Sequence, residues 1–149
     1  MKKIGEYTCR GSIRTDNAVI RIILDDGQFD TGYKIVEFEI AAHDMDNLFT
    51  NLYTAKLLTD DDTSTGVNWN WDDNAEIAWS IFGFDGNQNT TPNYFSRTDP
   101  DNLVIQDLFI RADEANGNDM KINYYIRMEK YDITDSQGVL AMVRNRSQA

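Results

Sequence analysis

The chain has 149 residues, 41% of them hydrophobic, and it carries a formal net charge of −11 at pH 7. This length favours a single domain, and the acidic balance disfavours binding to nucleic acid, which needs clustered Lys and Arg. No apolar run approaches the ~20 residues of a membrane-spanning helix, and the first residues show no secretory signal pattern, so no membrane partner is expected. Cys9 is the only cysteine, which excludes an internal disulfide.

Strand patterns follow one another along the chain, separated by turn signals. Apolar and polar side chains alternate, or β-branched side chains cluster, in segments that predict strands at residues 4–13, 18–24, 33–41, 52–59, 75–82, 103–112 and 120–131. The last is the clearest, because Ile122, Tyr124, Ile126 and Met128 alternate with polar residues. Residues 83–101 are rich in Asn, Thr, Gly and Asp and are predicted to form a loop.

The third predicted strand indicates which of its faces is buried. Val36, Phe38 and Ile40 are expected to point one way, and Glu37 and Glu39 the other, because successive side chains of a strand alternate between two faces. The apolar set should therefore face the core.

Seven short strands with no helical spacer predict an all-β fold, an antiparallel β-sandwich that is jelly-roll-like. An immunoglobulin-like Greek key fits the strand count equally well. Residues 1–131 are expected to form this sandwich, and residues 132–149 a short C-terminal helix or tail.

The period of the apolar pattern changes near the C-terminus. Val139, Met142 and Val143 share a face only in a helix, and Arg144 and Arg146 lie near its negative end. A helix this short needs packing against another surface, either as a lid on this subunit or on a neighbour. The neighbour is slightly favoured, and the predicted oligomer contact comprises Val139, Leu140, Met142, Val143, Arg144 and Arg146.

The most unusual stretch is the run of Asn, Trp and Asp at residues 68–74. Trp69 and Trp71 lie two residues apart and would share a face in extended chain. Exposed tryptophans beside Asn70 suit stacking on a sugar ring, which predicts a glycan site at Trp69, Asn70 and Trp71. The alternative, which is favoured, is that they fill one end of the core or an oligomer interface, where tryptophan is enriched.

A short echo, D-x-D-N-L, occurs twice, at residues 44–48 and 99–103. Carboxylates at this spacing suit a calcium ion, which makes Asp44, Asp46, Asp99 and Asp101 weak candidate ligands. The favoured interpretation is two turns stabilised by Asp side chains, since no complete calcium-loop pattern is present.

Motifs of the common enzyme classes are missing. The chain has no nucleophile elbow, phosphate-binding loop, dinucleotide fingerprint or zinc-protease pattern, and His43 is its only histidine. We therefore expect no enzyme activity and no cofactor.

Several phrases carry a resemblance to a known group of proteins: GQFDTGYKIVEFEI, NWNWDDNAEIAWS, DPDNLVIQDLFI and INYYIRMEKYDITDSQGVLAMVRNRSQ. They resemble short virion structural proteins of marine bacteriophages, most strongly from Asp99 onward. The resemblance implies a small, non-enzymatic component of the virion: a capsid shell, minor capsid, decoration or cement protein. Its partners would be copies of itself and other capsid proteins. The alternative is a carbohydrate-binding or receptor-binding module of a phage particle.

Overall fold

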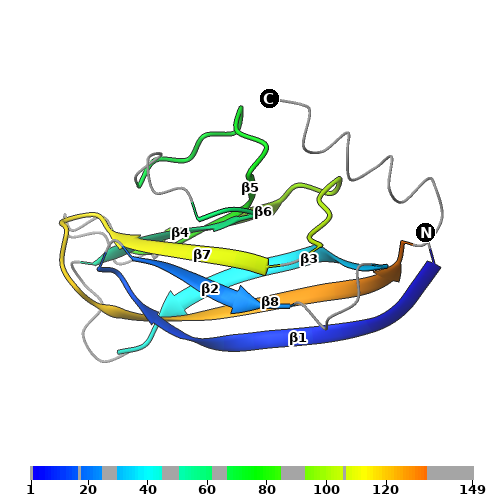
Figure 1. The fold of residues 1–149 in the computed structure, drawn as a ribbon. Helices are drawn as coiled ribbons and strands as arrows, with labels where there is room; N and C mark the ends of the chain where they lie inside the picture. Colours follow the sequence, from blue (N-terminus) through cyan, green and yellow to red (C-terminus); the bar gives the residue numbers. More distant parts are fainter. Residues whose placement is uncertain are drawn as a thin grey trace.

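The computed structural model describes residues 2–16, 18–24, 30–44, 51–61, 67–84, 93–105 and 107–133. This part of the chain forms eight strands and no helix (Figure 1). The strands are β1 (Lys2–Arg14), β2 (Val19–Ile23), β3 (Thr31–Ala42), β4 (Leu52–Leu58), β5 (Glu76–Gly83), β6 (Asn93–Thr98), β7 (Asp107–Glu114) and β8 (Lys121–Asp132). The predicted all-β class is confirmed.

The strands form two antiparallel sheets that pack face to face. One has three strands in the order β1-β8-β3, and the other has five in the order β2-β7-β4-β5-β6. The pairs β1–β8, β2–β7 and β4–β5 are nested along the chain: the first strand pairs with the last, the second with the last but one, and β4 with β5 lies inside both. Such nesting is typical of an eight-stranded jelly roll. β6 pairs with β5, and it is tied to β3 of the other sheet by a 2.5 Å hydrogen bond from the Tyr94 hydroxyl to Glu39.

Alternating side chains of both sheets fill the space between them. Ile122, Ile126 and Met128 of β8 are buried, as the alternation predicts, and they meet Leu57 of β4 and Ile110 of β7 in one continuous core. Each fully buried aliphatic side chain of this kind contributes roughly 1.5–3 kcal/mol of transfer free energy. The sandwich is therefore held together mainly by this interior.

The predicted loop at residues 83–101 is wrong in part, because it contains β6. The β6 side chains are mostly exposed and show no apolar alternation. β6 forms through hydrogen bonding to β5, and such tertiary pairing overrides a local composition that is typical of loops.

The predicted strand at residues 103–112 is divided in the structure. Val104 bridges to Tyr33 of β3 in the three-stranded sheet, with backbone hydrogen bonds of 2.7 Å in both directions. β7 begins only at Asp107 and belongs to the other sheet. The apolar run is therefore continuous in sequence while its residues pair with different sheets.

A register shift between Ile35 and Glu37 corrects the predicted face of β3. Ile35, Phe38 and Ile40 are buried, whereas Val36 is exposed. A bulge inserts one residue and so reverses the alternation before it. The amide of Asn102 stabilises this position: its Oδ1 accepts a hydrogen bond from the N–H of Ile35 at 2.8 Å, and its Nδ2 donates to the carbonyl of Ile35 at 2.9 Å.

The predictions for the C-terminus fall beyond the described residues. The C-terminal helix, with the contact residues Val139 to Arg146, lies entirely outside them. β8 ends at Asp132, close to the predicted limit of the sandwich at residue 131, and Ile133 is buried. The division into a sandwich and a C-terminal segment remains a prediction.

Candidate binding surface on the five-stranded sheet

The outer face of the five-stranded sheet carries an unusual set of side chains. Tyr53, Ala55 and Leu57 of β4 point into the core, so Lys56 between them points outward. Lys56 pairs with Trp79 of β5 on one side and with Arg111 of β7 on the other, which places all three on this face. A lysine here would ordinarily be solvated, yet the Lys56 side chain is only 2% exposed.

Glu76 supplies the charge that compensates Lys56. The Lys56 Nζ lies 3.0 Å from the Glu76 Oε2, and both side chains are buried. Asn70 donates to Glu76 twice, from its backbone N–H at 2.8 Å and from its Nδ2 at 3.0 Å, and the Trp79 indole donates at 3.0 Å. The carboxylate therefore accepts four hydrogen bonds, two at each oxygen. Through these bonds Glu76 positions Lys56, Asn70 and Trp79.

These contacts determine the pKa of Glu76. Burial raises the pKa of this carboxyl, but the hydrogen bonds from Trp79, Asn70 and Lys56 outweigh burial and hold the pKa below its usual value. The ionised form is therefore the stable one in the folded chain.

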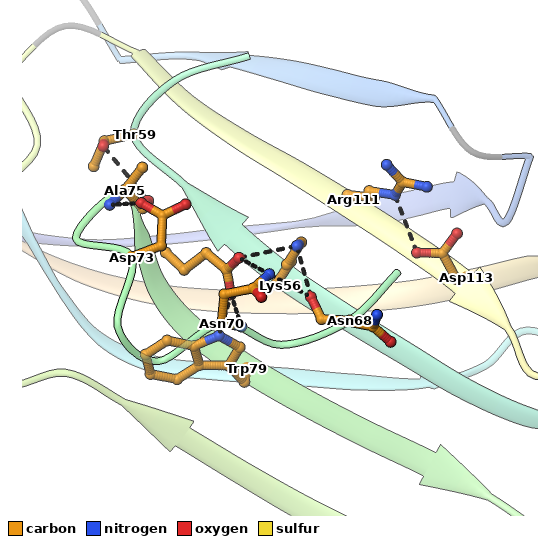
Figure 2. Close-up of polar contacts among 10 residues, drawn as sticks. Lys56, Thr59, Asn68, Asn70, Asp73, Ala75, Trp79, Arg111 and Asp113 are labelled. Atoms are coloured by element: carbon orange, nitrogen blue, oxygen red, sulfur yellow. Dashed lines mark hydrogen bonds and ion pairs between the residues drawn. The ribbon is translucent and has the colours of Figure 1, made fainter. Parts of the chain in front are cut away.

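The same network fixes the segment of residues 67–75 against the sheet. Lys56 Nζ also donates to the carbonyl of Asn68 at 2.8 Å, so both Asn68 and Asn70 are attached to the buried ion pair. Asp73 closes the turn into β5, because its Oδ1 accepts a hydrogen bond from the N–H of Ala75 at 2.9 Å (Figure 2). The segment that carries Trp69 and Trp71 is held by specific polar contacts at both of its ends.

Four aromatic side chains gather on this face, and we call Trp69, Trp71, Trp79 and Phe95 the aromatic platform. The Trp71 and Trp79 ring centroids are 5.6 Å apart, and those of Trp69 and Phe95 are 6.0 Å apart. Trp79 is buried, whereas Trp71 is 60% exposed. The platform thus consists of two ring pairs, and in one of them Trp79 supports Trp71 while most of the Trp71 ring is open to solvent.

Some polar groups around the platform already make hydrogen bonds within the described residues, and others do not. Both hydrogens of the Asn70 amide are occupied, by Glu76 and by the carbonyl of Asn68, which leaves its Oδ1 for a ligand. The indole N–H groups of Trp69 and Trp71 donate no hydrogen bond within the described residues. Arg97 lies beside the platform, with its guanidinium carbon 5.9 Å from the Phe95 ring centre. Supported rings with adjacent donors can stack on a planar or ring-shaped ligand and hydrogen-bond its edge.

The predicted calcium ligands are not brought together in the described part. Asp99 Oδ1 accepts a hydrogen bond from the N–H of Asp101 at 3.0 Å, which is the geometry of a turn stabilised by an Asp side chain. Asp44 lies instead beside His43, at 2.9 Å, and Asp46 is outside the described residues. Among the residues described, no cluster of three or more acidic, His or Cys side chains could hold a metal ion.

A shallow depression of about 600 Å³ lies on the outer face of the three-stranded sheet. It is lined by the basic Arg10 and Lys121 and the acidic Glu39, together with His43 and Tyr125. This mixture indicates no ligand of a particular charge.

Comparisons with known proteins return no relative: no family model, no curated protein and no solved structure matches this chain. None of the elements described above is a helix long and apolar enough to cross a membrane.

The sequence identifies only part of this surface. It singled out Trp69, Asn70 and Trp71, but it missed Lys56, Glu76, Phe95 and Arg97. Those residues come from β4, β5 and β6, and pairing between strands brings them together. The position of Lys56 in an apolar strand pattern was the one local signal of a buried charge.

Proposed function

We propose that this chain is a non-enzymatic structural protein of a bacteriophage particle, which associates with copies of itself or with the capsid lattice. Its resemblance to virion proteins of marine phages supports this role. Jelly-roll sandwiches recur in viral capsids and in lectins, so the fold is compatible with both roles.

The observation that carries the proposal is the exposure of the two consecutive edge strands, β1 and β2. Tyr7 and Ile4 of β1 are about half exposed, and Ile23 of β2 is 69% exposed. Each strand ends its sheet, so one edge of each has no strand partner among those described. Unpaired edges with exposed apolar side chains favour association with another chain.

The predicted C-terminal contact provides one test. A chain ending at Gly138 lacks the predicted apolar face of Val139, Met142 and Val143 and is expected to form a smaller assembly than the full chain. Light scattering on a sizing column measures both masses, and circular dichroism confirms that the truncated chain is folded. If the two masses correspond to the same number of subunits, the predicted contact is wrong.

The aromatic platform favours a second candidate function, glycan binding by the particle. If Trp71 and Trp69 stack on a sugar ring, Trp71→Ala and Trp69→Ala should each weaken glycan retention by up to about tenfold, because stacked aromatic contacts contribute up to roughly 1.5 kcal/mol. Retention on a glycan array measures this effect. Trp71 is largely exposed, so its removal should leave the fold intact.

Tyr94→Ala is the matched control for the glycan experiment. Tyr94 is an exposed aromatic residue on the same strand as Phe95, but it lies on the opposite face. Its loss should leave glycan retention unchanged. Unchanged retention in both tryptophan variants would instead rule out this function for the platform.

A further inference from the structure

β1 is a long strand with one free edge. It spans 13 residues, of which Ile13 is the only buried one and Gly5 and Cys9 are partly buried. Its pairing with β8 occupies one edge, and no described strand lies on the other. Such an edge presents unpaired N–H and C=O groups to another chain.

The backbone contacts show which residues face that free edge. Thr15 N–H donates to the carbonyl of Met120 at 2.8 Å, in the same register that pairs Ile13 with Ile122. From Gly5 onward, odd-numbered residues of β1 therefore direct their backbone groups toward β8, and even-numbered ones direct theirs outward. Glu6, Thr8 and Arg10 thus have N–H and C=O groups available for a further strand.

The segment Gly5 to Gly11, which reads GEYTCRG, is complementary to itself when reversed. An antiparallel copy centred on Thr8 sets Glu6 opposite Arg10 and glycine opposite glycine. Glu6 and Arg10 lie on the same outer face of the sheet, so each pair would bring a carboxylate to a guanidinium. Arg10 makes no ion pair within the described residues, whereas Glu6 is bound to Arg127 at 2.6 Å and to Lys3.

We propose that two copies of this chain pair through β1 about a two-fold axis at Thr8, which joins their three-stranded sheets into one six-stranded sheet. Centring the axis on Glu6 or on Arg10 would place like charges opposite each other, and centring it on Tyr7 or Cys9 would separate Glu6 from Arg10. Charge complementarity therefore selects both the second copy as partner and the register. The contact is isologous, with the same patch used by both subunits.

The inference goes beyond the proposed function, because it names a surface and a register and does not depend on a role in the virion. The bulge after Lys3 limits the paired stretch at its N-terminal end. Tyr7, which is 51% exposed in one subunit, would lie opposite Cys9 of the second copy and lose much of that exposure.

Charge reversal tests the proposal. Arg10→Glu places two acidic side chains opposite each other at both ends of the paired stretch, and the dimer dissociation constant should rise roughly tenfold or more. Glu6→Arg should have the same effect, and the double variant Glu6→Arg/Arg10→Glu should restore the dimer. Arg97→Glu, the same change on an edge strand of the other sheet, is the control. Sedimentation velocity over a concentration series measures all four.

A cross-link tests the register independently of charge. In the proposed dimer, residue 7 lies opposite the native Cys9 in a pair without backbone hydrogen bonds, where Cα atoms are about 4.5 Å apart and a disulfide can form. Mild oxidation of Tyr7→Cys should yield a covalent dimer on non-reducing gels, while Tyr7→Ser should not.

A monomeric full chain at every concentration, a double variant that fails to restore the dimer, or no cross-link in Tyr7→Cys would each overturn the proposal. These outcomes are separate from the fate of the proposed function. The proposed role in a phage particle is tested by the presence of the chain in such particles. That role would still hold if the chain were present there and associated through another surface.

Discussion

Replacing Glu76 by Gln is expected to lower the free energy of unfolding by about 3–5 kcal/mol, which is the usual cost of leaving one partner of a buried ion pair uncompensated. Gln keeps nearly the same shape and one acceptor oxygen. It removes the negative charge that faces Lys56, whose side chain is 2% exposed and cannot regain water without moving. In a chain of this size the melting temperature should fall by about 10 °C.

The matched control for Glu76→Gln is Asp72→Asn, which makes the same chemical change in the same segment at an exposed position. It should alter stability by less than about 0.5 kcal/mol. Urea unfolding followed by tryptophan fluorescence measures both variants. If Glu76→Gln proves as stable as its control, the buried pair does not anchor the Trp69–Trp71 segment as we describe.

The pH dependence of the same pair has a definite sign. The pKa of Glu76 is lowered in the folded chain, so its contribution is fully present above the ordinary glutamate pKa of about 4.3 and is lost as the pH falls through the lowered value. The stability difference between the natural chain and Glu76→Gln should therefore be constant near pH 7 and shrink in acid. A difference that grows toward low pH would contradict this assignment.

Asn102→Ala is expected to cost about 2–4 kcal/mol, because it leaves the N–H and C=O of Ile35 buried without their partners. Ile35 and Asn102 are 0% and 5% exposed, so water does not readily replace the amide. The neighbouring bridge between Tyr33 and Val104 should weaken as well.

Hydrogen exchange resolves the effect of Asn102→Ala residue by residue. The amide of Ile35 should exchange faster, and the global stability measured in urea should fall. Asn93→Ala removes an exposed amide on β6 and is the control, expected to change stability by less than about 0.5 kcal/mol. Unchanged exchange at Ile35 would mean that the Asn102 amide does not support the bulge.

Strand positions were largely predictable because the apolar pattern along most strands is set by which face meets the core. Alternation in β8 located its buried side chains correctly, since that strand is central and paired on both edges. β6 escaped prediction because it is an exposed edge strand, formed by hydrogen bonds to β5. The bulge at Val36 escaped because its partner, Asn102, is 67 residues away from Ile35 in sequence.

The candidate site was predictable only where its composition is unusual. Two tryptophans among Asn and Asp residues attract attention in any sequence, and Trp71 is indeed exposed. Pattern alone could not show that Asn70 donates to a buried carboxylate or that Phe95 supports Trp69. Those relations depend on the order of strands in the sheet, which a single sequence does not determine.

The role that we propose for this chain is that of a structural part of a phage particle. The direct measurement is its copy number in purified particles of a phage that encodes it, determined by quantitative mass spectrometry after density-gradient purification and a high-salt wash. We predict a fixed, multi-copy ratio to the major shell protein that survives the wash. Absence of the chain from particles, with the protein found only free in the lysate, would contradict the claim.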